Sequence, residues 1–213
     1  MNKRIQTLAN LIDSVESLAD VGCDHGLLTL SALNSGKCKW AIISDVSEKC
    51  LLKARELLKE YVLAGKVIPV CTNGLDGLRE VDLVIIAGMG GEETVSILTR
   101  ANFLPDRLLL QPMKNTEKVR KTIASLGYYI EKDFTFYVKD KYYDVIKAKK
   151  GKDSLTEEEL EFGRTNLLEK PKGFIKKLNA EKQLLTGVLE NGGLSEKAQK
   201  DVLIKLRKIE KYV

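Results

Sequence analysis

Five short apolar segments, each followed by a turn residue, recur along the first half of this 213-residue chain. Apolar residues are continuous within each segment, which is typical of strands covered on both faces, as in a parallel sheet. Between the segments the apolar residues have helical spacing, and the longest helix is expected to end at a left-handed Gly65. This alternation predicts right-handed crossovers and an open, doubly wound α/β sheet. The five segments are SLADVG, WAIISD, KVIPVCT, VDLVIIAG and RLLLQP.

The end of this region changes from the β–α rhythm to a predicted hairpin. Residues 127–138 and 142–150 are rich in aromatic and β-branched residues and are joined by the segment KDK, which is typical of two antiparallel strands. A mostly parallel sheet that ends in a hairpin favours the Rossmann-like fold of class I methyltransferases over that of dehydrogenases. Before the first strand, Ile5, Leu8 and Ile12 share one face of a predicted helix that covers the sheet.

The composition changes after Gly151, where aromatic residues become rare and charged residues and leucine dominate. Ser154 and Glu157 have the spacing of a helix-capping box. The ranges 171–193 and 195–213 then carry narrow apolar stripes, which predict two long antiparallel helices packed as in a coiled coil. The expected domains are residues 1–151, a Rossmann-like methyltransferase domain, and residues 152–213, a C-terminal helical domain that resembles a coiled coil.

The overall composition indicates the cellular location and the broad class of the protein. Hydrophobic residues make up 44% and charged residues 31% of the chain, as in a protein with a packed core and a hydrated surface. No stretch approaches the roughly 18 apolar residues of a membrane-spanning helix, and the N-terminal segment lacks the apolar core of a signal peptide. We therefore expect a cytoplasmic protein without a membrane partner. Four scattered cysteines and a single histidine do not form zinc-ligand patterns, so we expect no metal and buried or half-buried thiols.

The segment LADVGCDHGLL, residues 18–28, reads as a strand, a glycine turn and the start of a helix. A dinucleotide-binding loop needs three glycines in the pattern G-x-G-x-x-G, so that pyrophosphate approaches the backbone. Asp24 occupies the middle position here, and its carboxylate would repel a pyrophosphate. S-adenosylmethionine (AdoMet) carries a sulfonium and an ammonium group and no phosphate, so a carboxylate attracts it. Asp20, Gly22 and Gly26 match D/E-x-G-x-x-x-G, the methyltransferase form of this loop; the alternative is an ordinary turn in which Asp20 caps the helix.

Two further loops at the ends of predicted strands carry candidate cofactor contacts. Asp45 lies 25 residues after Asp20, near the separation expected of the acid that accepts hydrogen bonds from both ribose hydroxyls. The alternative role for Asp45 is helix capping. After the third strand, Asn73-Gly74-Leu75 offers a polar side chain and a backbone N–H to an adenine edge, with Leu75 against the ring. The alternative there is a turn without a ligand role.

The fourth strand ends in AGMGG, residues 87–91, a glycine-rich ledge. Enzymes that methylate amino groups often carry the motif [DN]-P-P-[YF] at this place, and that motif is absent. The ledge Ala87-Gly88-Met89-Gly90-Gly91 is rich in glycine, which suits close stacking of a flat substrate beside the transferred methyl group. Alternatively, the glycines serve only the packing of the loop.

Together these motifs resemble those of a known family, the bacterial tRNA (adenine-N1)-methyltransferases that act on adenine 22 in the D loop of tRNA. The similar segments are RI near the start, ADVGCDHGLL, NGL, AGMGG, LQP and YYDVI, which occur in this order and span about residues 4–150. The combination of D-x-G-x-D-H and GMGG is quite specific, whereas either motif alone is weak. The family usually has alanine at Gly26, a branched or polar residue at Cys23, and a glutamate at Asp45.

The resemblance implies methyl transfer from AdoMet to N1 of adenine in tRNA. Neutral adenine N1 has a lone pair that attacks the methyl group directly, so alignment matters more than a strong base. A carboxylate would stabilise the cationic product, and Asp24 is the first candidate for that role. His25 either shapes the substrate pocket or is held by backbone at the helix start. Tyr142 or Tyr143 either stacks on the flipped base or only packs the hairpin. The expected catalytic residues are Asp24, His25, Met89 and Tyr143, and the expected cofactor contacts are Arg4, Asp20, Gly22, Cys23, Gly26, Asp45, Val46, Asn73, Gly74, Leu75, Ala87, Gly88 and Met89.

The net charge of +5 is mild and does not by itself indicate an anionic partner, but two lysine-rich groups are candidate phosphate-binding surfaces for tRNA. The alternative is a solvated lysine-rich face. Two other functions stay open: an AdoMet methyltransferase with a protein or small-molecule substrate, and a non-catalytic RNA-binding protein with the same fold. We expect a monomer or a weak dimer. The first group is Lys114, Lys118, Arg120 and Lys121, and the second is Lys139, Lys141, Lys147, Lys149, Lys150 and Lys152.

Overall fold

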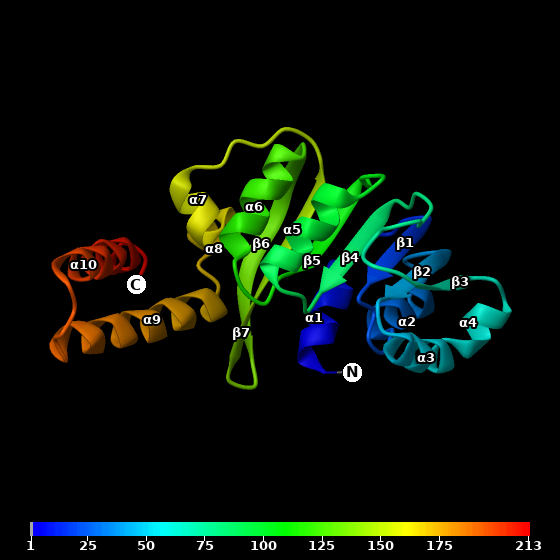
Figure 1. Cartoon of the computed structure of the whole chain (residues 1–213), viewed down its shortest axis with the longest axis horizontal. Helices are drawn as coiled ribbons and strands as arrows, with labels where there is room; N and C mark the ends of the chain where they lie inside the picture. Colours follow the sequence, from blue (N-terminus) through cyan, green and yellow to red (C-terminus); the bar gives the residue numbers. More distant parts are fainter. Residues whose placement is uncertain (1) are drawn as a thin grey trace.

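A computed structural model describes residues 2–213 of the chain. Its centre is a seven-stranded sheet with the strand order β3-β2-β1-β4-β5-β7-β6 (Figure 1). Strands β1 to β5 pair in parallel, and β7 pairs antiparallel with both β5 and β6. The predicted doubly wound sheet that ends in a hairpin is confirmed. The strands are β1 Ser17–Val21, β2 Trp40–Asp45, β3 Val67–Cys71, β4 Leu83–Ala87, β5 Arg107–Gln111, β6 Tyr128–Val138 and β7 Lys141–Lys150.

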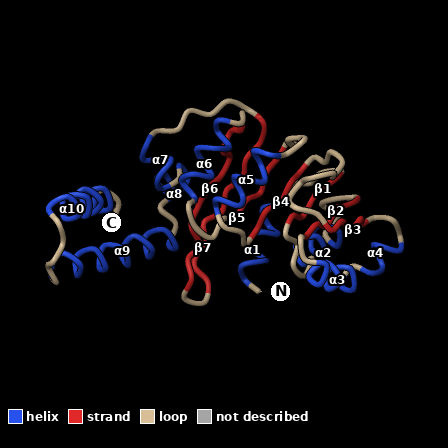
Figure 2. Tube along the Cα trace, viewed as in Figure 1, coloured by secondary structure: helices blue, strands red, loops and turns tan. Residues whose placement is uncertain are grey.

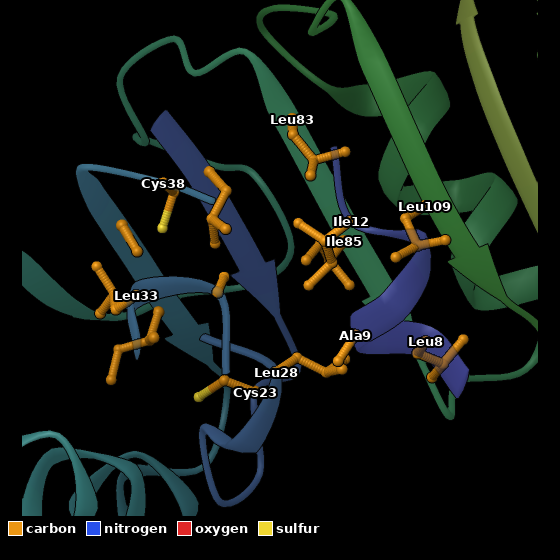
Figure 3. Close-up of a cluster of buried hydrophobic side chains, with 14 of the residues drawn as sticks. Leu8, Ala9, Ile12, Cys23, Leu28, Leu33, Cys38, Leu83, Ile85 and Leu109 are labelled. Atoms are coloured by element: carbon orange, nitrogen blue, oxygen red, sulfur yellow. The ribbon is translucent and has the colours of Figure 1, made fainter. Parts of the chain in front are cut away.

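Helices cover both faces of the sheet. Helices α1 to α4 pack on one face, and α5 and α6 pack on the other. The N-terminal helix α1 covers the middle of its face, where Leu8 and Ile12 lie near Ile85 of β4 and Leu109 of β5 (Figure 3). These helices are α1 Lys3–Leu11, α2 Leu27–Asn34, α3 Glu48–Leu57, α4 Lys59–Leu63, α5 Gly91–Arg100 and α6 Thr116–Ser125.

Adjacent residues along a central strand belong to different cores. Ile43 and Ile85 pack against α1 to α4, whereas Ile42 and Ile86 pack against α5 and α6. All four side chains are at most 2% exposed. Because successive side chains of a strand point to opposite faces, a strand buried on both faces needs apolar residues at every position. The continuous apolar runs of the sequence have this cause.

The hairpin of β6 and β7 turns through Lys139 and Asp140. Both residues have positive φ angles, 46° and 61°, which is the backbone of a two-residue type I′ turn. The phenol ring of Tyr137 lies 5.0 Å from that of Tyr142 across the strands. The predicted connection KDK is thus one residue shorter in the structure, because Lys141 already belongs to β7.

The helix expected to end at Gly65 is broken into α3 and α4. Leu58 lies between them with φ −100° and ψ 14°, and its side chain is fully buried. The bend brings Leu58 against the first loop, where a Cβ added to Gly26 would lie 2.9 Å from the Leu58 Cδ1 atom. The prediction of one helix was wrong, but the left-handed conformation at Gly65, with φ 68°, is confirmed.

Four helices, α7 to α10, follow the hairpin and form what we call the tail. The chain runs away from the sheet along α9 and returns along α10 (Figures 1 and 2). A small apolar cluster of Phe162, Phe174, Leu178 and Ile209 holds these helices together. The apolar contacts of α9 are concentrated in its first half, since Leu184 is 67% exposed. The tail helices are α7 Glu157–Phe162, α8 Arg164–Glu169, α9 Lys172–Glu190 and α10 Glu196–Glu210.

The capping box of α7 lies two residues later than predicted. Thr156 accepts a hydrogen bond from the backbone N–H of Glu159, and the Glu159 carboxylate accepts one from the Thr156 N–H. Ser154 and Glu157 make no such box in the structure. Just before α7, the Asp153 carboxylate accepts a hydrogen bond from the Ile130 N–H of β6, which ties the segment before the helix to the sheet.

A buried ion pair joins the tail to the sheet. The Arg120 Nε atom of α6 donates to Asp133 Oδ2 of β6 at 2.7 Å, and both side chains are at most 2% exposed. Arg120 also donates to the backbone carbonyls of Leu160 and Glu161 in α7, while Asp133 accepts the backbone N–H of Thr165 in α8. The prediction that Arg120 belongs to an exposed basic surface was therefore wrong.

Side chains that follow β6 in the chain cover its outer edge. Backbone N–H groups of Ile130, Asp133 and Thr135 donate to the side chains of Asp153, Thr165 and Asn166, at 2.8 to 2.9 Å. The last strand of the sheet therefore has hydrogen-bond partners on both of its sides.

Within residues 2–213, no helix is long and apolar enough to cross a membrane. Cys23 and Cys38 are buried and Cys50 is half-buried, as predicted, but Cys71 is exposed. Cys71 is the last residue of β3, which is an edge strand of the sheet, so that end lacks a neighbour to cover it.

Candidate functional site

A cavity of about 420 Å³ opens at the carboxyl ends of β1, β2 and β4. Sheets of this kind bind ligands at this edge, and the volume is within the usual range for small-molecule sites. The first helix and the start of α5 complete its wall. The lining residues are Arg4, Ile5, Asp20, Gly22, Cys23, Asp24, His25, Leu27, Leu28, Asp45, Val46, Cys50, Ala87, Gly88, Met89 and Glu93.

The loop after β1 adopts left-handed backbone at three positions. Gly22, Asp24 and Gly26 have φ angles of 67°, 46° and 68°. The Met89 side chain lies against Gly22, since an added Cβ would lie 2.1 Å from the Met89 Cε atom. Asp24 lacks the conformational freedom of glycine, and its left-handed backbone is uncommon and often found at functional sites.

Asp20 is the deepest carboxylate of the cavity. It is 3% exposed, and its Oδ2 atom accepts a hydrogen bond from the Thr29 hydroxyl at 2.9 Å. Burial raises the pKa of Asp20 to about 6, and the hydrogen bonds from Thr29 oppose this shift. A buried carboxylate with one hydroxyl partner is well suited to a cationic ligand group, which would offset the loss of hydration.

Asp24 and His25 lie at the mouth of the cavity. Their side chains are 67% and 54% exposed, and the His25 Nε2 atom lies 3.7 Å from Asp24 Oδ1. Asp24 is thus within reach of a large substrate at the surface, unlike Asp20. Glu93, in the first turn of α5, also lines the cavity. Its place there could not be predicted from the sequence, because acidic residues are common in the first turn of helices.

Asp45 ends β2 and is half-buried at the cavity wall. Its Oδ1 atom accepts the backbone N–H of Ser47 at 2.8 Å, while Ser47 itself caps α3. The alternative role of Asp45 as the helix cap therefore belongs to Ser47. Asp45 Oδ2 has no hydrogen bond within residues 2–213, and Val46 beside it is 69% exposed.

The NGL segment does not line this cavity. Leu75 is 1% exposed and packs in the core between the sheet and α5. A Cβ on Gly74 would lie 2.9 Å from Ile97 of α5, so close helix packing accounts for this glycine. Asn73 is exposed. Contact of Asn73, Gly74 and Leu75 with an adenine ring remains a prediction.

Protein atoms cover two glycines of the ledge after β4. A Cβ on Gly88 would lie 2.7 Å from Arg4 Nη2, and one on Gly91 would lie 2.4 Å from the Lys114 carbonyl oxygen. The Met113 N–H also donates to the Met89 carbonyl at 2.8 Å, which ties the loops after β4 and β5 together. The packing interpretation of these glycines thus has direct structural support.

Tyr143 lies on β7, outside the residues that line the cavity. Its ring stacks on Phe136 with centroids 5.4 Å apart and an interplanar angle of 25°. The Arg4 guanidinium lies 5.6 Å from the same ring. At least one face of the Tyr143 ring therefore packs within the hairpin, as the alternative predicts. Stacking of Tyr143 on a base stays a prediction.

The two lysine-rich groups differ in their surroundings. Lys114, Lys118 and Lys121 are exposed beside the ledge and on α6, and Lys118 pairs with Glu92. The second group does not form one surface, because it is spread along the length of β7 and beyond it. Several of its members are also paired: Lys147 with Asp13, Lys149 with Glu131 and Lys150 with Asp106.

A family model described as "methyltransferase domain" matches residues 1–146. The chain belongs to this methyltransferase family. The tRNA (adenine(22)-N(1))-methyltransferase of Bacillus subtilis is 28% identical to it over 156 residues, which cover 71% of this chain and 66% of the relative. These matches agree with the resemblance found in the motifs.

Two solved structures share the complete architecture of this methyltransferase. TrmK of M. capricolum, in complex with S-adenosyl-homocysteine, superposes with a TM-score of 0.90 at 26% identity and covers 100% of this chain and 97% of that chain. A Streptococcus pneumoniae protein in complex with S-adenosyl-L-methionine has a TM-score of 0.88 at 26% identity, with coverage of 100% and 99%. Both matches include the tail.

Proposed function

We propose that this methyltransferase transfers a methyl group from AdoMet to N1 of adenine in tRNA, at position 22 of the D loop. The observation that carries the proposal is the match to the Bacillus subtilis enzyme, whose name states this reaction. The similarity over the whole chain to structures that contain AdoMet or its product supports the choice of cofactor.

The cavity fits this cofactor in its chemistry. Its walls carry the carboxylates of Asp20, Asp24, Asp45 and Glu93, which attract a ligand with sulfonium and ammonium groups and repel a pyrophosphate. The left-handed Gly22 provides a close backbone approach at the loop. Within the described residues 2–213, no cluster of side chains suits a metal ion, and the proposed reaction needs none.

Three of these four carboxylates have distinct proposed tasks. Asp45 binds the ribose hydroxyls through the oxygen that Ser47 leaves free. Asp20, deep in the cavity, holds the cofactor ammonium group. Asp24, at the mouth, faces the adenine ring and stabilises the positive charge that the ring gains on methylation.

The cofactor, when bound, supplies a methyl group that is activated by its sulfonium. Neutral adenine N1 carries no proton, so no side chain has to act as a base. The protein's contribution is to align N1 with the methyl carbon and to exclude water. Met89 lies against Gly22 and lines the cavity, where its side chain would contact the cofactor and the incoming base beside the transferred methyl group.

The proposal also concerns the organisation of the chain. Residues 1–151 would form the catalytic domain, and residues 152–213 would form a helical domain that contacts tRNA together with Lys114, Lys118 and Lys121. Such contacts to phosphates position the RNA without selecting a base. A tRNA substrate would agree with a cytoplasmic location, and we expect the protein to be a monomer or a weak dimer.

The test is the formation of 1-methyladenosine in vitro. The purified protein is incubated with AdoMet and an unmodified tRNA transcript, and the digested nucleosides are analysed by mass spectrometry. We expect 1-methyladenosine with the wild-type transcript and none with a transcript that carries guanosine at position 22. Methylation of another nucleoside, or none despite measured AdoMet binding, would refute the proposal.

A further inference from the structure

Gln111, the last residue of β5, is a buried polar side chain next to the candidate site. It is fully buried, and its Oε1 atom accepts a hydrogen bond from Arg4 Nε at 2.6 Å. Its Nε2 atom donates to the Pro112 carbonyl oxygen at 3.2 Å and to the sulfur of Met113. These contacts fix the orientation of the amide, because the nitrogen side is occupied and only the oxygen faces Arg4.

The Arg4 side chain runs from α1 over the ledge to the wall of the cavity. Gly88, with φ 90°, leaves the space for it, since an added Cβ would lie 2.7 Å from Arg4 Nη2. The bond to Gln111 uses Nε alone, so that in the described part of the chain both terminal nitrogens are free of hydrogen bonds. An arginine held at Nε presents its remaining N–H groups as a fixed fork.

Charge complementarity indicates which anion this fork binds. Four carboxylates line the cavity, and Arg4 is the one lysine or arginine among its lining residues. AdoMet carries one carboxylate beside its two cationic centres, so a single guanidinium among acids matches it. An RNA phosphate at this place would meet the repulsion of the surrounding carboxylates.

We propose that Gln111 is a positioning residue that orients the Arg4 guanidinium to bind the carboxylate of the cofactor's methionine end. This inference rests on the proposed use of AdoMet. Gln111 touches neither cofactor nor substrate and acts through Arg4. Gly88 belongs to the same unit, because a side chain there would displace the guanidinium.

The experiment compares two ligands that differ only in this carboxylate: AdoMet and decarboxylated AdoMet. Their dissociation constants are measured by calorimetry for the wild type, Arg4→Ala, Gln111→Leu and the double variant. Arg4→Ala should weaken AdoMet binding about ten- to a hundredfold, as expected for the loss of a charge-assisted pair, and leave decarboxylated AdoMet nearly unchanged. Gln111→Leu should reduce the ratio of the two constants about three- to tenfold, and should have no further effect on it in the Arg4→Ala background.

The ratio of the two dissociation constants distinguishes a positioning role of Gln111 from a general effect on the stability of the fold. A Gln111→Leu protein that is merely less stable would lose affinity for both ligands equally, and that result would overturn the proposal. Unchanged AdoMet binding in Arg4→Ala with a raised KM for tRNA would assign Arg4 to a phosphate and overturn it as well. Lys3→Ala removes an exposed charge from the same helix and should match the wild type. Failure of the wild type to bind either ligand would instead contradict the proposed function.

Discussion

Asp20 and Asp24 belong to one loop and have opposite surroundings. Asp20 is buried against Thr29, whereas the Asp24 side chain is 67% exposed at the mouth of the cavity. A deep carboxylate meets a small ligand that enters the cavity, and a carboxylate at the mouth meets the larger substrate that stays outside. This separation supports the proposed roles of Asp20 in cofactor binding and of Asp24 in the contact with the methylated ring.

Asp24→Asn should therefore impair the reaction more than cofactor binding. The substitution keeps the shape of the side chain and removes the charge that stabilises the cationic product, so we expect kcat to fall about ten- to a hundredfold. The dissociation constant of AdoMet should stay within about threefold of the wild type. Steady-state kinetics with tRNA and calorimetry measure the two quantities. Asp106→Asn, at the opposite edge of the sheet, is the matched control, and an Asp24→Asn variant with normal kcat would remove Asp24 from the mechanism.

AdoMet affinity should fall as the pH decreases through about 6. Burial raises the pKa of Asp20 from 3.8 to about 6, so the free protein takes up a proton there below this pH. Only the ionised form attracts the cofactor ammonium, and we expect binding to weaken about three- to tenfold between pH 7 and pH 5. Calorimetry across this range tests the effect. Asp20→Asn should bind weakly at every pH, whereas His25→Gln should keep the pH dependence; loss of the dependence in His25→Gln would assign it to the histidine.

At the scale of elements, the joint between sheet and tail depends on one glycine. Gly163 links α7 to α8 with φ 93°, and an added Cβ would lie 2.6 Å from Asp133 Oδ2 and 2.8 Å from Arg120 Nη2. Any side chain there would separate the two members of a fully buried ion pair. Breaking such a pair leaves an uncompensated charge in the interior.

Gly163→Ala should lower the free energy of unfolding by about 3 kcal/mol or more, through backbone strain and the disturbed ion pair. Gly187→Ala is the matched control, because Gly187 lies within α9 and an added Cβ would have no neighbour within 4 Å. That variant should be stabilised by about 0.5–1 kcal/mol, the difference in helix propensity. Urea titrations of both variants measure the effects, and equal stabilities would contradict this account of the joint.

The sheet could be predicted from sequence because its signal is local. Strands buried on both faces need apolar runs, and a positive φ at a turn needs glycine or a short polar residue. What could not be predicted depends on distant partners: the burial of Arg120 requires Asp133 on another element, and the role of Gln111 requires Arg4, 107 positions away. Leu58, at the break between α3 and α4, likewise packs against Gly26, a residue distant in the sequence.

Within the candidate site, the loops after β1, β2 and β4 were predicted to converge, and they do, because parallel strands end at the same edge. The segment Asn73-Gly74-Leu75 shows the limit of that argument. It also follows a strand, yet Leu75 packs into the core and not into the cavity. The chain order places a loop at the edge, but side-chain packing decides which way the loop faces.

For the whole molecule, the distribution of charge determines how tRNA would bind. The net charge is +5, and Lys114, Lys118 and Lys121 are exposed beside the ledge and on α6, next to the candidate site. Many other lysines are already paired with carboxylates of the same chain. We therefore expect few phosphate contacts, concentrated near the ledge.

Binding of tRNA should weaken with salt in proportion to these contacts. With about three to five phosphates neutralised, the logarithm of the association constant should fall with a slope of roughly −2 to −4 against the logarithm of salt concentration. Filter binding between about 50 and 200 mM salt gives the slope. Lys114→Ala should make this slope shallower by about one, because one phosphate contact is lost. Lys150→Ala, at the far end of β7, should leave the slope unchanged. A slope near zero would argue against a nucleic-acid substrate.

Because side chains after the hairpin cover the edge of β6, we expect this part of the chain to hinder self-association. An open sheet presents unpaired N–H groups at its last strand, and such an edge readily pairs with a second copy. Here Thr165, Asn166 and Asp153 occupy those groups. A chain cut after Gly151 would expose the edge and the buried Arg120 together, so we expect it to aggregate on light scattering and not to yield a smaller, monomeric enzyme. On this account, we expect the segment after the hairpin to keep the molecule from aggregating whether or not RNA is present.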